Sequence, residues 1–333
     1  MNIARNLEVA VQNYPDVSAV MFEGITYSYC DANAWANRYA NLLLSHGVSC
    51  GDRVALFLPN IPEFVFAYYG IQKLGAVAVS INARLKPDEV KFILADSGAV
   101  AVITSRELLD NVPLENRTNL LVVGPDPRAG DLMTASPEFT SCDLSADTPS
   151  AILYTSGTTG TPKGAVLSHG NVTSNVTAAI RHCGLHRNDR MLLFVPLFHC
   201  FGQNAIMNCA VACGATLVLH RQFIPSDILA SIEQNQVTHF YGVPTTFIWL
   251  LTAGVTPPDL TSVRYFFSAA AKLPVEIAQQ WRELFGRPIH EGYGLTETSP
   301  FSSYNHESHY RLGSVGTPIQ HVEMQVWDEH DKE

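Results

Sequence analysis

The sequence predicts an α/β protein with two doubly wound, mostly parallel sheets and helices on both faces of each sheet. Two observations carry this prediction: a strand–helix–strand–helix–strand pattern that occurs twice, and a loop rich in glycine and hydroxyl groups directly after a strand. The chain has 333 residues, of which 47% are hydrophobic and 16% charged, so it can bury a large core. Its net charge of −10 and its scattered basic residues argue against a nucleic-acid partner.

The internal repeat begins at Gly47 and again at Gly184. The first copy reads GVSCGDRVALFLP, EFVFAYYGIQKL, GAVAVSI, LKPDEVKFILADS and AVAVIT, and the second reads GLHRNDRMLLFVP, GQNAIMNCAVAC, GATLVLH, FIPSDILASIEQN and VTHFYGV. In both copies an Asp-Arg pair follows the glycine at the same spacing, Asp52-Arg53 in the first and Asp189-Arg190 in the second. A proline then follows the aspartate at the same spacing in both, Pro59 and Pro196. In parallel sheets, ligands bind beyond the carboxyl ends of the strands, so the loops there are where chemistry is expected.

Other segments complete the scaffold. An amphipathic helix is predicted over residues 31–46, before the first copy of the repeat. Residues 113–149 are rich in Pro, Asp, Asn and Ser, and are interpreted as connecting loops around one short strand, LLVVG.

The loop after the predicted strand Ala151–Tyr154 has the composition of a phosphate-binding loop. Its glycines let backbone N–H groups approach a polyanion, and its hydroxyls and ammonium add donors. The Walker A pattern is excluded, because its glycines are spaced differently and Ser or Thr follows its lysine. A plain surface loop is the alternative, but a loop this dense in donors has little structural purpose. The loop comprises Thr155, Ser156, Gly157, Thr158, Thr159, Gly160, Thr161, Pro162, Lys163 and Gly164.

This loop resembles the phosphate loop of the adenylate-forming superfamily, which includes acyl- and aryl-CoA synthetases, peptide-synthetase adenylation domains and luciferases. Three further segments resemble that family's motifs in order and spacing: Pro196-Leu197-Phe198-His199, the run EGYGLTET from Glu291 to Thr298, and GSVGTP from Gly313 to Pro318. The likeness is greatest to ligases that join fatty or aryl acids to CoA. It implies that the substrate is a carboxylic acid activated by ATP as an acyl-adenylate.

The resemblance also implies roles for single residues. Lys163 and the loop would wrap the β- and γ-phosphates, Tyr293 would lie against the adenine, and Thr296 would bond the α-phosphate. Glu297, with Thr155, would hold Mg²⁺, a hard cation that prefers oxygen ligands. The catalytic set is Lys163, His199, Thr296 and Glu297. The nucleotide-binding set is Thr155, Ser156, Gly157, Thr158, Thr159, Gly160, Lys163, Ala270, Ala271, Lys272, Glu291, Gly292, Tyr293, Gly294 and Thr296.

The acid pocket is assigned to segments that follow the strands of the second copy. It would be formed by His199, Phe201, Gly202, Tyr241, Gly242, Ser268, Ala269 and Ala270. This lining is apolar and aromatic and holds no cation, which favours an uncharged aliphatic or aromatic acid over a dicarboxylate. No aspartate is placed to receive an amino group, which argues against an amino acid. Ala269 and Lys272 depart from the glycine and proline usual in the family.

Each singled-out residue has a structural alternative. Tyr293 could be a half-buried core tyrosine, and Glu297 could cap a helix. A lone histidine is commonly structural, but only the second copy carries one at this strand end, so His199 is predicted to line the site near the carboxylate. His169, His239 and His290 are given no such role.

The resemblance implies a domain order. Subdomain 1 would cover about residues 20–150, subdomain 2 about 151–305, and the start of a small β-barrel about 306–333, within a five-layer αβαβα arrangement. A mobile lid domain, which carries a catalytic lysine and most of the CoA site, would lie beyond Glu333. Losing such a cation costs about 10²–10³ in rate, so slow adenylation is expected.

The remaining features bound the setting. The seven cysteines form no CxxC pair, the N-terminus is no secretory signal, and no apolar run is long enough to span a membrane, which together favour a reducing cytoplasm. ATP and AMP are the expected partners, and the acyl acceptor is CoA or a carrier protein. The rival functions are an acyl-AMP ligase that loads a carrier protein, a luciferase-like oxygenase, and a non-catalytic module that binds nucleotide or acyl groups.

Overall fold

The strands form two parallel-rich sheets in a computed structural model that describes residues 1–113, 119–124, 129–155, 161–328 and 330. The first sheet has six strands, in the order β6 (Leu120–Val123), β5 (Ala99–Ser105), β3 (Arg53–Phe57), β4 (Val77–Ser80), β7 (Pro149–Thr155) and β8 (Lys163–Ser168). The second has nine, in the order β15 (Thr317–Pro318), β14 (Phe301–Tyr304), β13 (Ile289–Gly294), β12 (Tyr265–Ser268), β11 (His239–Gly242), β9 (Arg190–Leu193), β10 (Thr216–Leu219), β1 (Ser18–Phe22) and β2 (Ile25–Ser28). The predicted fold class is confirmed.

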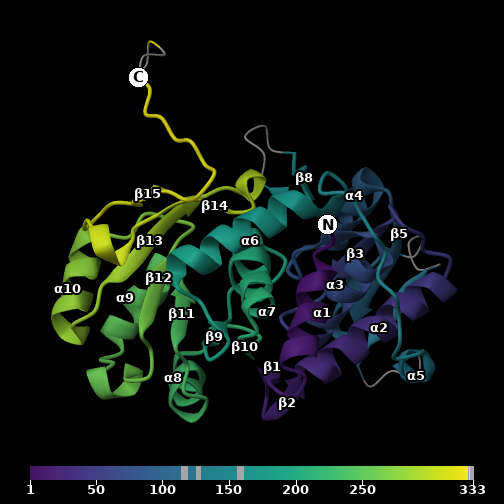
Figure 1. Cartoon of the computed structure of the whole chain (residues 1–333), viewed down its shortest axis with the longest axis horizontal. Coiled ribbons are helices and arrows are strands. Elements are labelled where there is room, and N and C mark those ends of the chain that lie inside the picture. The colour runs from purple at the N-terminus through teal and green to yellow at the C-terminus, as the bar shows by residue number, and fades with distance from the viewer. Residues whose placement is uncertain (114–118, 125–128, 156–160, 329, 331–333) are drawn as a thin grey trace.

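Helices lie between the sheets and on their outer faces (Figure 1). The helices nearest the middle of the molecule are α1 (Ala4–Asn13), α2 (Tyr29–Ser45), α3 (Pro62–Leu74), α6 (His169–Cys183), the π-helix η3 (Phe201–Asn208) and α7 (Cys209–Cys213). The others are α4 (Pro87–Ser97), α5 (Ala129–Thr134), α8 (Pro225–Gln234), α9 (Pro244–Thr252), α10 (Val275–Phe285) and the short turns η1 (Arg106–Asn111), η4 (Pro257–Leu260), η5 (Thr296–Thr298) and η6 (Glu307–His309). Proline opens α3, α4, α8 and α9, where its missing N–H has no intrahelical partner to lose.

The repeat seen in the sequence is a repeat in space. The first unit, β3 to β5, places its strands in the order β5-β3-β4, and the second unit, β9 to β11, places its strands in the order β11-β9-β10. Gly75 and Gly214 end the first helical segment of each unit, and both have φ of 76°. This left-handed conformation is one that glycine adopts without strain.

The expected division near residue 150 does not separate the two sheets. β7 and β8 follow it in sequence yet extend the six-stranded sheet, where β7 pairs with β4. β1 and β2 precede it yet pair with β10 at the edge of the nine-stranded sheet. The sheets therefore exchange edge strands, because each repeat unit supplies only the three central strands of its sheet.

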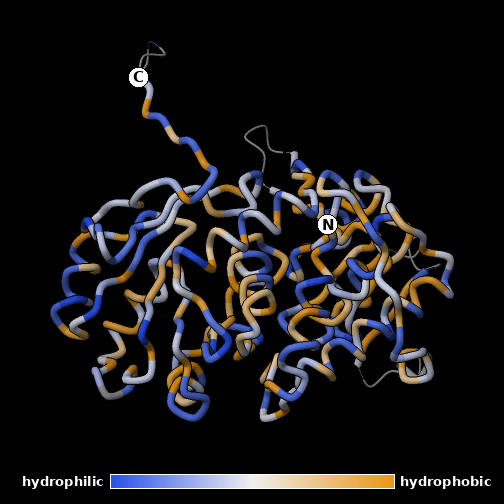
Figure 2. Tube along the Cα trace, in the orientation of Figure 1, coloured by the Kyte–Doolittle hydropathy of each residue, from blue (hydrophilic) through white to orange (hydrophobic). Residues whose placement is uncertain are grey.

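One apolar core joins the inner faces of both sheets. Val54 and Leu56 of β3 point into it, whereas Ala55 and Phe57 point outward into a smaller cluster under α4. This alternation is that of a strand buried on both faces. Figure 2 shows hydrophobic residues concentrated on the inner strands and helices and polar residues at the loops.

The C-terminal region continues the nine-stranded sheet. β14 and β15 pair antiparallel beyond β13, and the chain then leaves the body as an extended segment (Figures 1 and 2). Within the described residues these strands do not close into the small barrel expected over residues 306–333. None of the helices described is both long and apolar enough to cross a membrane.

Candidate functional site

The β7–β8 hairpin presents the ends of the predicted phosphate loop. Thr155 and Lys163 are paired across the two strands, so the hydroxyl and the exposed ammonium emerge at one end of the hairpin. Ser156, Gly157, Thr158, Thr159 and Gly160, which complete the prediction, lie outside the described residues. Gly164 faces Tyr154, and a Cβ on it would lie 2.8 Å from Ile152, so glycine permits this pairing.

The loop that carries His199 is held by the first unit. After β9, the backbone N–H of Leu197 donates to Oδ1 of Asn60 at 2.8 Å. Nδ2 of Asn60 in turn donates to the carbonyls of Val195 (3.0 Å) and His220 (3.3 Å). Asn60 is buried, so its amide fixes the path of the chain into His199.

The hydrogen bonding of His199 defines its tautomer. Its Nδ1 accepts from the backbone N–H of Phe201 at 3.2 Å, so Nδ1 carries no proton and the neutral ring holds its proton on Nε2. One edge of the ring is open to solvent, but the protein packed around the rest lowers the pKa of His199 below its usual value. At neutral pH the ring therefore offers Nε2–H as a donor.

The turn η5 holds Thr296 and Glu297 at the end of β13. Asn175 of α6 donates to the carbonyls of Thr298 (3.0 Å) and Phe301 (2.8 Å), and the thiol of Cys200 lies 4.0 Å from the carbonyl of Thr296. The Glu297 carboxylate is exposed. With the carbonyls engaged inward, the Thr296 and Glu297 side chains are left for ligands.

Three of the predicted segments meet at one cavity of about 260 Å³. Thr155, His199 and Thr296 line it, and they come from β7, from the loop after β9 and from η5. The other lining residues are Ser80, Asn82, Leu85, Glu89, Ile93, Leu153, Tyr154, Pro162, Phe198 and Cys200. The cavity lies beyond the carboxyl ends of β4 and β7, as expected for a parallel sheet.

The predicted adenine segment lies on β13. Tyr293 is 45% exposed, and the glycines on either side of it are required by close packing. A Cβ on Gly292 would lie 2.4 Å from the Phe267 ring, and one on Gly294 would lie 1.7 Å from the Pro300 carbonyl. Tyr293 therefore projects from a strand whose neighbouring positions accept no side chain.

Glu291 is buried, unlike the exposed Tyr293 two residues later on the same strand. It is 4% exposed, its Oε2 accepts from the Leu273 N–H at 3.4 Å, and burial raises its pKa while Lys272 opposes that shift. Its backbone pairs with Ser268 of β12. Ala270 and Ala271 are exposed in the loop after Ser268, and Ala270 has φ of 71°, a conformation that favours glycine.

The residues predicted to line the acid pocket separate onto two faces of the nine-stranded sheet. Phe201 and Tyr241 are buried on the inner face, with ring centroids 6.4 Å apart, and both contact Phe267. Ser268 follows Phe267 on β12 and so points to the outer face. The Gly242 carbonyl accepts from Ala269 N–H at 3.3 Å. Gly202 is needed for packing, since a Cβ there would lie 2.3 Å from the Pro196 carbonyl.

The donors at the cavity suit a magnesium ion that arrives with phosphate. Among the described residues no group of three or more His, Cys, Asp or Glu side chains could hold a metal by itself. Mg²⁺ in nucleotide sites commonly takes one or two carboxylates plus phosphate oxygens. The Thr155 hydroxyl lines the cavity, and the exposed Glu297 carboxylate adjoins Thr296 of its lining, which is the kind of oxygen donor that this pattern needs.

Sequence reasoning missed several residues at this cavity. Ser80 and Asn82 follow β4, and the rule that ligands lie beyond the carboxyl ends of parallel strands could have identified them. Cys200 has no motif that sets it apart from the other six cysteines. Asn60 does not line the cavity but holds the loop that carries His199. The amide contacts of Asn60 have no signal in a single sequence.

A separate cavity of about 270 Å³ lies between α2, α3 and β6, with walls that include Trp35, Tyr39 and Phe66. None of the predicted site residues lines it. It borders Gly124 and Asp131, next to residues outside the described part of the chain.

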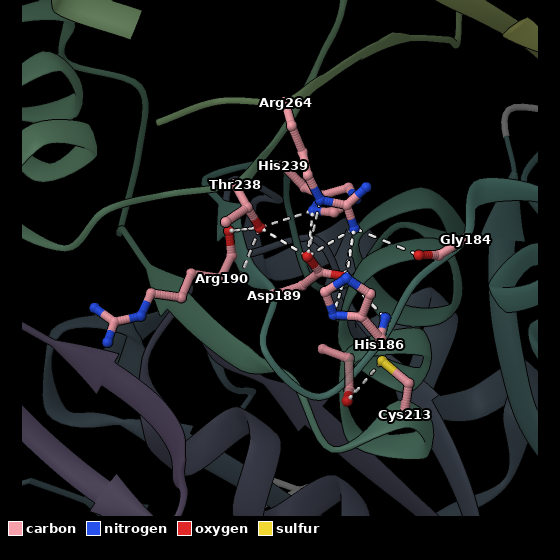
Figure 3. A network of polar contacts seen from close by, with 9 residues as sticks. Gly184, His186, Asp189, Arg190, Cys213, Thr238, His239 and Arg264 are labelled. Carbon is pink, nitrogen blue, oxygen red and sulfur yellow. Dashed lines mark hydrogen bonds and ion pairs between the residues drawn. The ribbon is translucent and has the colours of Figure 1, made fainter. Parts of the chain in front are cut away.

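A second polar cluster lies at the opposite edge of the nine-stranded sheet, at the amino ends of its strands (Figure 3). Asp189 is buried and accepts from Arg264 Nη2 at 2.8 and 2.9 Å, and from Thr238 at 3.2 Å. Thr238 is also 2.9 Å from Nδ1 of His239. This cluster ties the starts of β9, β11 and β12 together, which is a structural role.

Comparison with known proteins adds an independent finding. Residues 7–333 match the family described as AMP-binding enzyme. The chain is 33% identical over 307 residues to a feruloyl-CoA synthase of Amycolatopsis sp, covering 91% of this chain and 62% of that protein. It is 30% identical over 361 residues to a long-chain-fatty-acid–CoA ligase of Bacillus subtilis, covering 96% of this chain and 64% of that protein. The chain thus spans just under two thirds of these relatives.

Solved structures agree in fold. The anthranilate CoA ligase AuaEII in complex with anthranoyl-AMP superposes with a TM-score of 0.93 at 27% identity, over 100% of this chain and 66% of that one. The N-terminal domain of FACL13 from Mycobacterium tuberculosis superposes with a TM-score of 0.90 at 29% identity, over 99% of this chain and 85% of that one.

Proposed function

Since this chain belongs to the AMP-binding enzyme family, we propose that it activates an uncharged aliphatic or aromatic carboxylic acid with ATP as an acyl-adenylate, which is then passed to CoA. Two of the relatives are a feruloyl-CoA synthase and a long-chain-fatty-acid–CoA ligase, and the AuaEII structure is a complex with anthranoyl-AMP. Each of these names describes the relative, and they support the same chemistry here.

One observation carries the proposal: Thr155, His199 and Thr296 line the same cavity although they are far apart in the sequence. Lys163 pairs with Thr155 and brings an ammonium to the same end of the hairpin. The Thr155 hydroxyl and the His199 imidazole at the cavity, with the Lys163 ammonium at the adjoining end of the hairpin, suit two anionic reactants.

The residues of this chain would position the two reactants and neutralise their charge, and none of them would form a covalent bond to a reactant. A carboxylate oxygen attacks the α-phosphorus of ATP, a bond forms between them, and the bond from that phosphorus to the bridging oxygen breaks to release pyrophosphate. Lys163 offsets charge on the phosphates, and Nε2–H of His199 donates to an oxygen of the reacting pair. In-line alignment and charge stabilisation are the main contributions that a protein can make to this reaction.

Glu297 and Thr155 would hold Mg²⁺ together with the phosphates. When bound, this ion supplies charge neutralisation at the phosphate oxygens.

The substrate class is proposed from the lining of the site. The described lining of the cavity around His199 includes apolar and aromatic side chains and no arginine or lysine that would pair with a second carboxylate. Burying an unpaired carboxylate costs several kcal/mol, so a dicarboxylate is disfavoured.

The test is acid-dependent pyrophosphate release by the 333-residue chain, with hydroxylamine present to trap acyl-adenylate. The panel comprises benzoate, hydroxybenzoate, ferulate, octanoate, palmitate, malonate and alanine. Release is expected with one or more of the first five acids. Release with malonate or alanine alone would contradict the proposed substrate class.

A matched pair of variants ties the activity to the site. Glu297→Gln is expected to lower acid-dependent release by about 10–100-fold, the loss of a hydrogen-bonded charge. Glu283→Gln, an exposed glutamate on α10, should leave release unchanged. Equal rates for both variants would remove Glu297 from the mechanism. Adding CoA or a carrier protein to the acyl-adenylate then identifies the acceptor.

A further inference from the structure

A chain of buried hydrogen bonds runs along the π-helix η3 toward the turn that carries Thr296. The Tyr69 hydroxyl of α3 donates to Oδ1 of Asn208 at 2.7 Å. Nδ2 of Asn208 donates to Oδ1 of Asn204 at 2.9 Å, and Nδ2 of Asn204 donates to Sγ of Cys200 at 3.3 Å. The Cys200 thiol lies 4.0 Å from the carbonyl of Thr296, with its S–H on the donor side.

These contacts have one direction. From Asn208 onward, each side chain accepts from the member before it and donates to the member after it, and Asn208 Nδ2 also donates to the Tyr68 hydroxyl at 3.1 Å. The thiol stays protonated because burial raises the pKa of Cys200 to about 12. Bonds aligned in this way reinforce one another in a low-dielectric interior.

The side chains in this series of hydrogen bonds are polar and buried, and packing of the core alone does not require polar groups there. Tyr69, Asn204, Asn208 and Cys200 are each at most 1% exposed, in a region otherwise filled by aliphatic and aromatic residues. Apolar residues of similar shape would satisfy the same space without any polar group to pair. A π-helix is also rare, and such segments are frequent at functional sites.

The contacts at the Cys200 end of this series of hydrogen bonds indicate its role. Asn175 of α6 holds the carbonyl of Thr298, and Cys200 contacts the carbonyl of Thr296, so the turn η5 is held from two sides. Cys200 is adjacent to His199, and both line the cavity with Thr296. The Cys200 thiol is therefore one of the contacts that hold Thr296 near His199.

We propose that Cys200, Asn204 and Asn208 are positioning residues that set the Thr296–Glu297 turn at its distance from His199, and that they tune nucleotide affinity from inside the core. This rests on the proposed function only in its nucleotide readout. Asn204 and Asn208 do not line the cavity, so any effect of replacing them reaches the ligand through Cys200 and the turn.

The decisive variants are Asn204→Ala and Cys200→Ala, and Cys209→Ala is the matched control. Cys209 is likewise 1% exposed and its thiol also lies 4.0 Å from a carbonyl, that of Val176, but it contacts no part of the turn. Asn204→Ala and Cys200→Ala are expected to weaken binding of ATP with Mg²⁺ about three- to tenfold by calorimetry, the loss of about one hydrogen bond. Cys209→Ala should bind as the wild type does.

Hydrogen exchange provides a readout that needs no ligand. The amides of Leu295, Thr298 and Ser299 are bonded within or beside the turn. They should exchange at least about threefold faster in Asn204→Ala and Cys200→Ala and at the wild-type rate in Cys209→Ala. Cys200→Ser keeps a donor and should restore most of the protection, which also decides the question if Asn204→Ala fails to fold.

The outcomes separate this proposal from the proposed function. If the wild type binds no ATP with Mg²⁺, the nucleotide function fails and exchange alone judges the positioning role. If Cys200→Ala and Cys209→Ala change exchange at the turn equally, or leave it unchanged, the positioning role is overturned whether or not nucleotide binds.

Discussion

The two repeat units share a scaffold and differ in what they attach to it. Both place a glycine, an Asp-Arg pair and a proline around their first strand, and in both the aspartate accepts a backbone N–H three residues earlier at 2.8 Å. The Asp52 side chain is nevertheless 31% exposed, whereas that of Asp189 is fully buried among Arg264, Thr238 and His239. The same local turn is thus a surface cap in one unit and the centre of a core network in the other.

The loops at the carboxyl ends of β3 and β9, the first strands of the two units, also differ. Pro196 leads to His199, which lines the cavity, whereas Pro59 leads to Asn60, which does not. Asn60 instead bonds the N–H of Leu197, the residue that holds the equivalent place in the second unit. The comparison teaches that one unit carries the chemistry and its counterpart holds it in place.

The largest contrast is expected between the two aspartates. Asp189→Ala should lower the free energy of unfolding by about 1.5–3 kcal/mol, because it removes the buried carboxylate that accepts from Arg264 and Thr238. Asp52→Ala should cost about 1 kcal/mol, the value of an ordinary hydrogen bond. Urea denaturation measures both, and equal losses would mean that the Asp189 network adds nothing to the shared turn.

The two loops should separate activity from stability. His199→Ala is expected to lower acid-dependent pyrophosphate release by about 10–100-fold, which corresponds to about 1.5–3 kcal/mol for a hydrogen bond to a charged group, with little change in stability. Asn60→Ala should instead lower the free energy of unfolding by about 1–3 kcal/mol, because it leaves buried carbonyls unpaired. If His199→Ala unfolds more readily than Asn60→Ala and keeps full activity, the division of labour is wrong.

The second unit should also carry a dependence on pH that the first lacks. Burial lowers the pKa of His239 to about 3, and the first unit has Ala101 at the equivalent register. Protons then bind the unfolded chain more readily, so stability is lost as pH falls from about 6.5 toward 3, with a slope near 1.4 kcal/mol per pH unit. In urea titrations between pH 7 and 5, His239→Gln should lose less stability than the wild type. An unchanged slope would show that His239 does not contribute.

The smallest difference in stability between the two units is predicted at the glycines that end their first helical segments, where the backbone conformations are alike. Gly75→Ala and Gly214→Ala each force alanine into φ of 76°, which costs about 1–2 kcal/mol. Their side chains would also meet Cys50 and Tyr14 respectively, each closer than 3.0 Å. Similar shifts in urea midpoint are expected, and a difference of more than about 1 kcal/mol would show that the scaffolds are less equivalent than their strand order suggests.

Much of the fold could be predicted because the repeat is local. The equal spacing around Asp52 and Asp189 reveals the repeat, and the repeat predicts the alternation of strands and helices. The exchange of β1 and β7 between sheets could not be predicted, because strand pairing between distant segments leaves no mark in one sequence. For that reason the sequence does not show that strands on both sides of residue 150 contribute to each sheet.

The candidate site shows the same limit. Thr155, His199 and Thr296 were identified from motifs, and the structure brings them to one cavity. Tyr241 on β11 and Phe201 in η3 are buried against Phe267, and their assignment to the acid pocket stays a prediction. Cys200 and Asn60 act through contacts that only the folded chain creates.

The central claim is that a carboxylate attacks the α-phosphorus of ATP in this cavity. The most direct measurement supplies an acid labelled with ¹⁸O in its carboxylate, together with ATP and Mg²⁺, and traps the product with hydroxylamine before mass spectrometry. We expect AMP that carries one ¹⁸O atom and unlabelled pyrophosphate, and we expect His199→Ala to form about 10–100-fold less of both products. Label in inorganic phosphate with formation of ADP would contradict it.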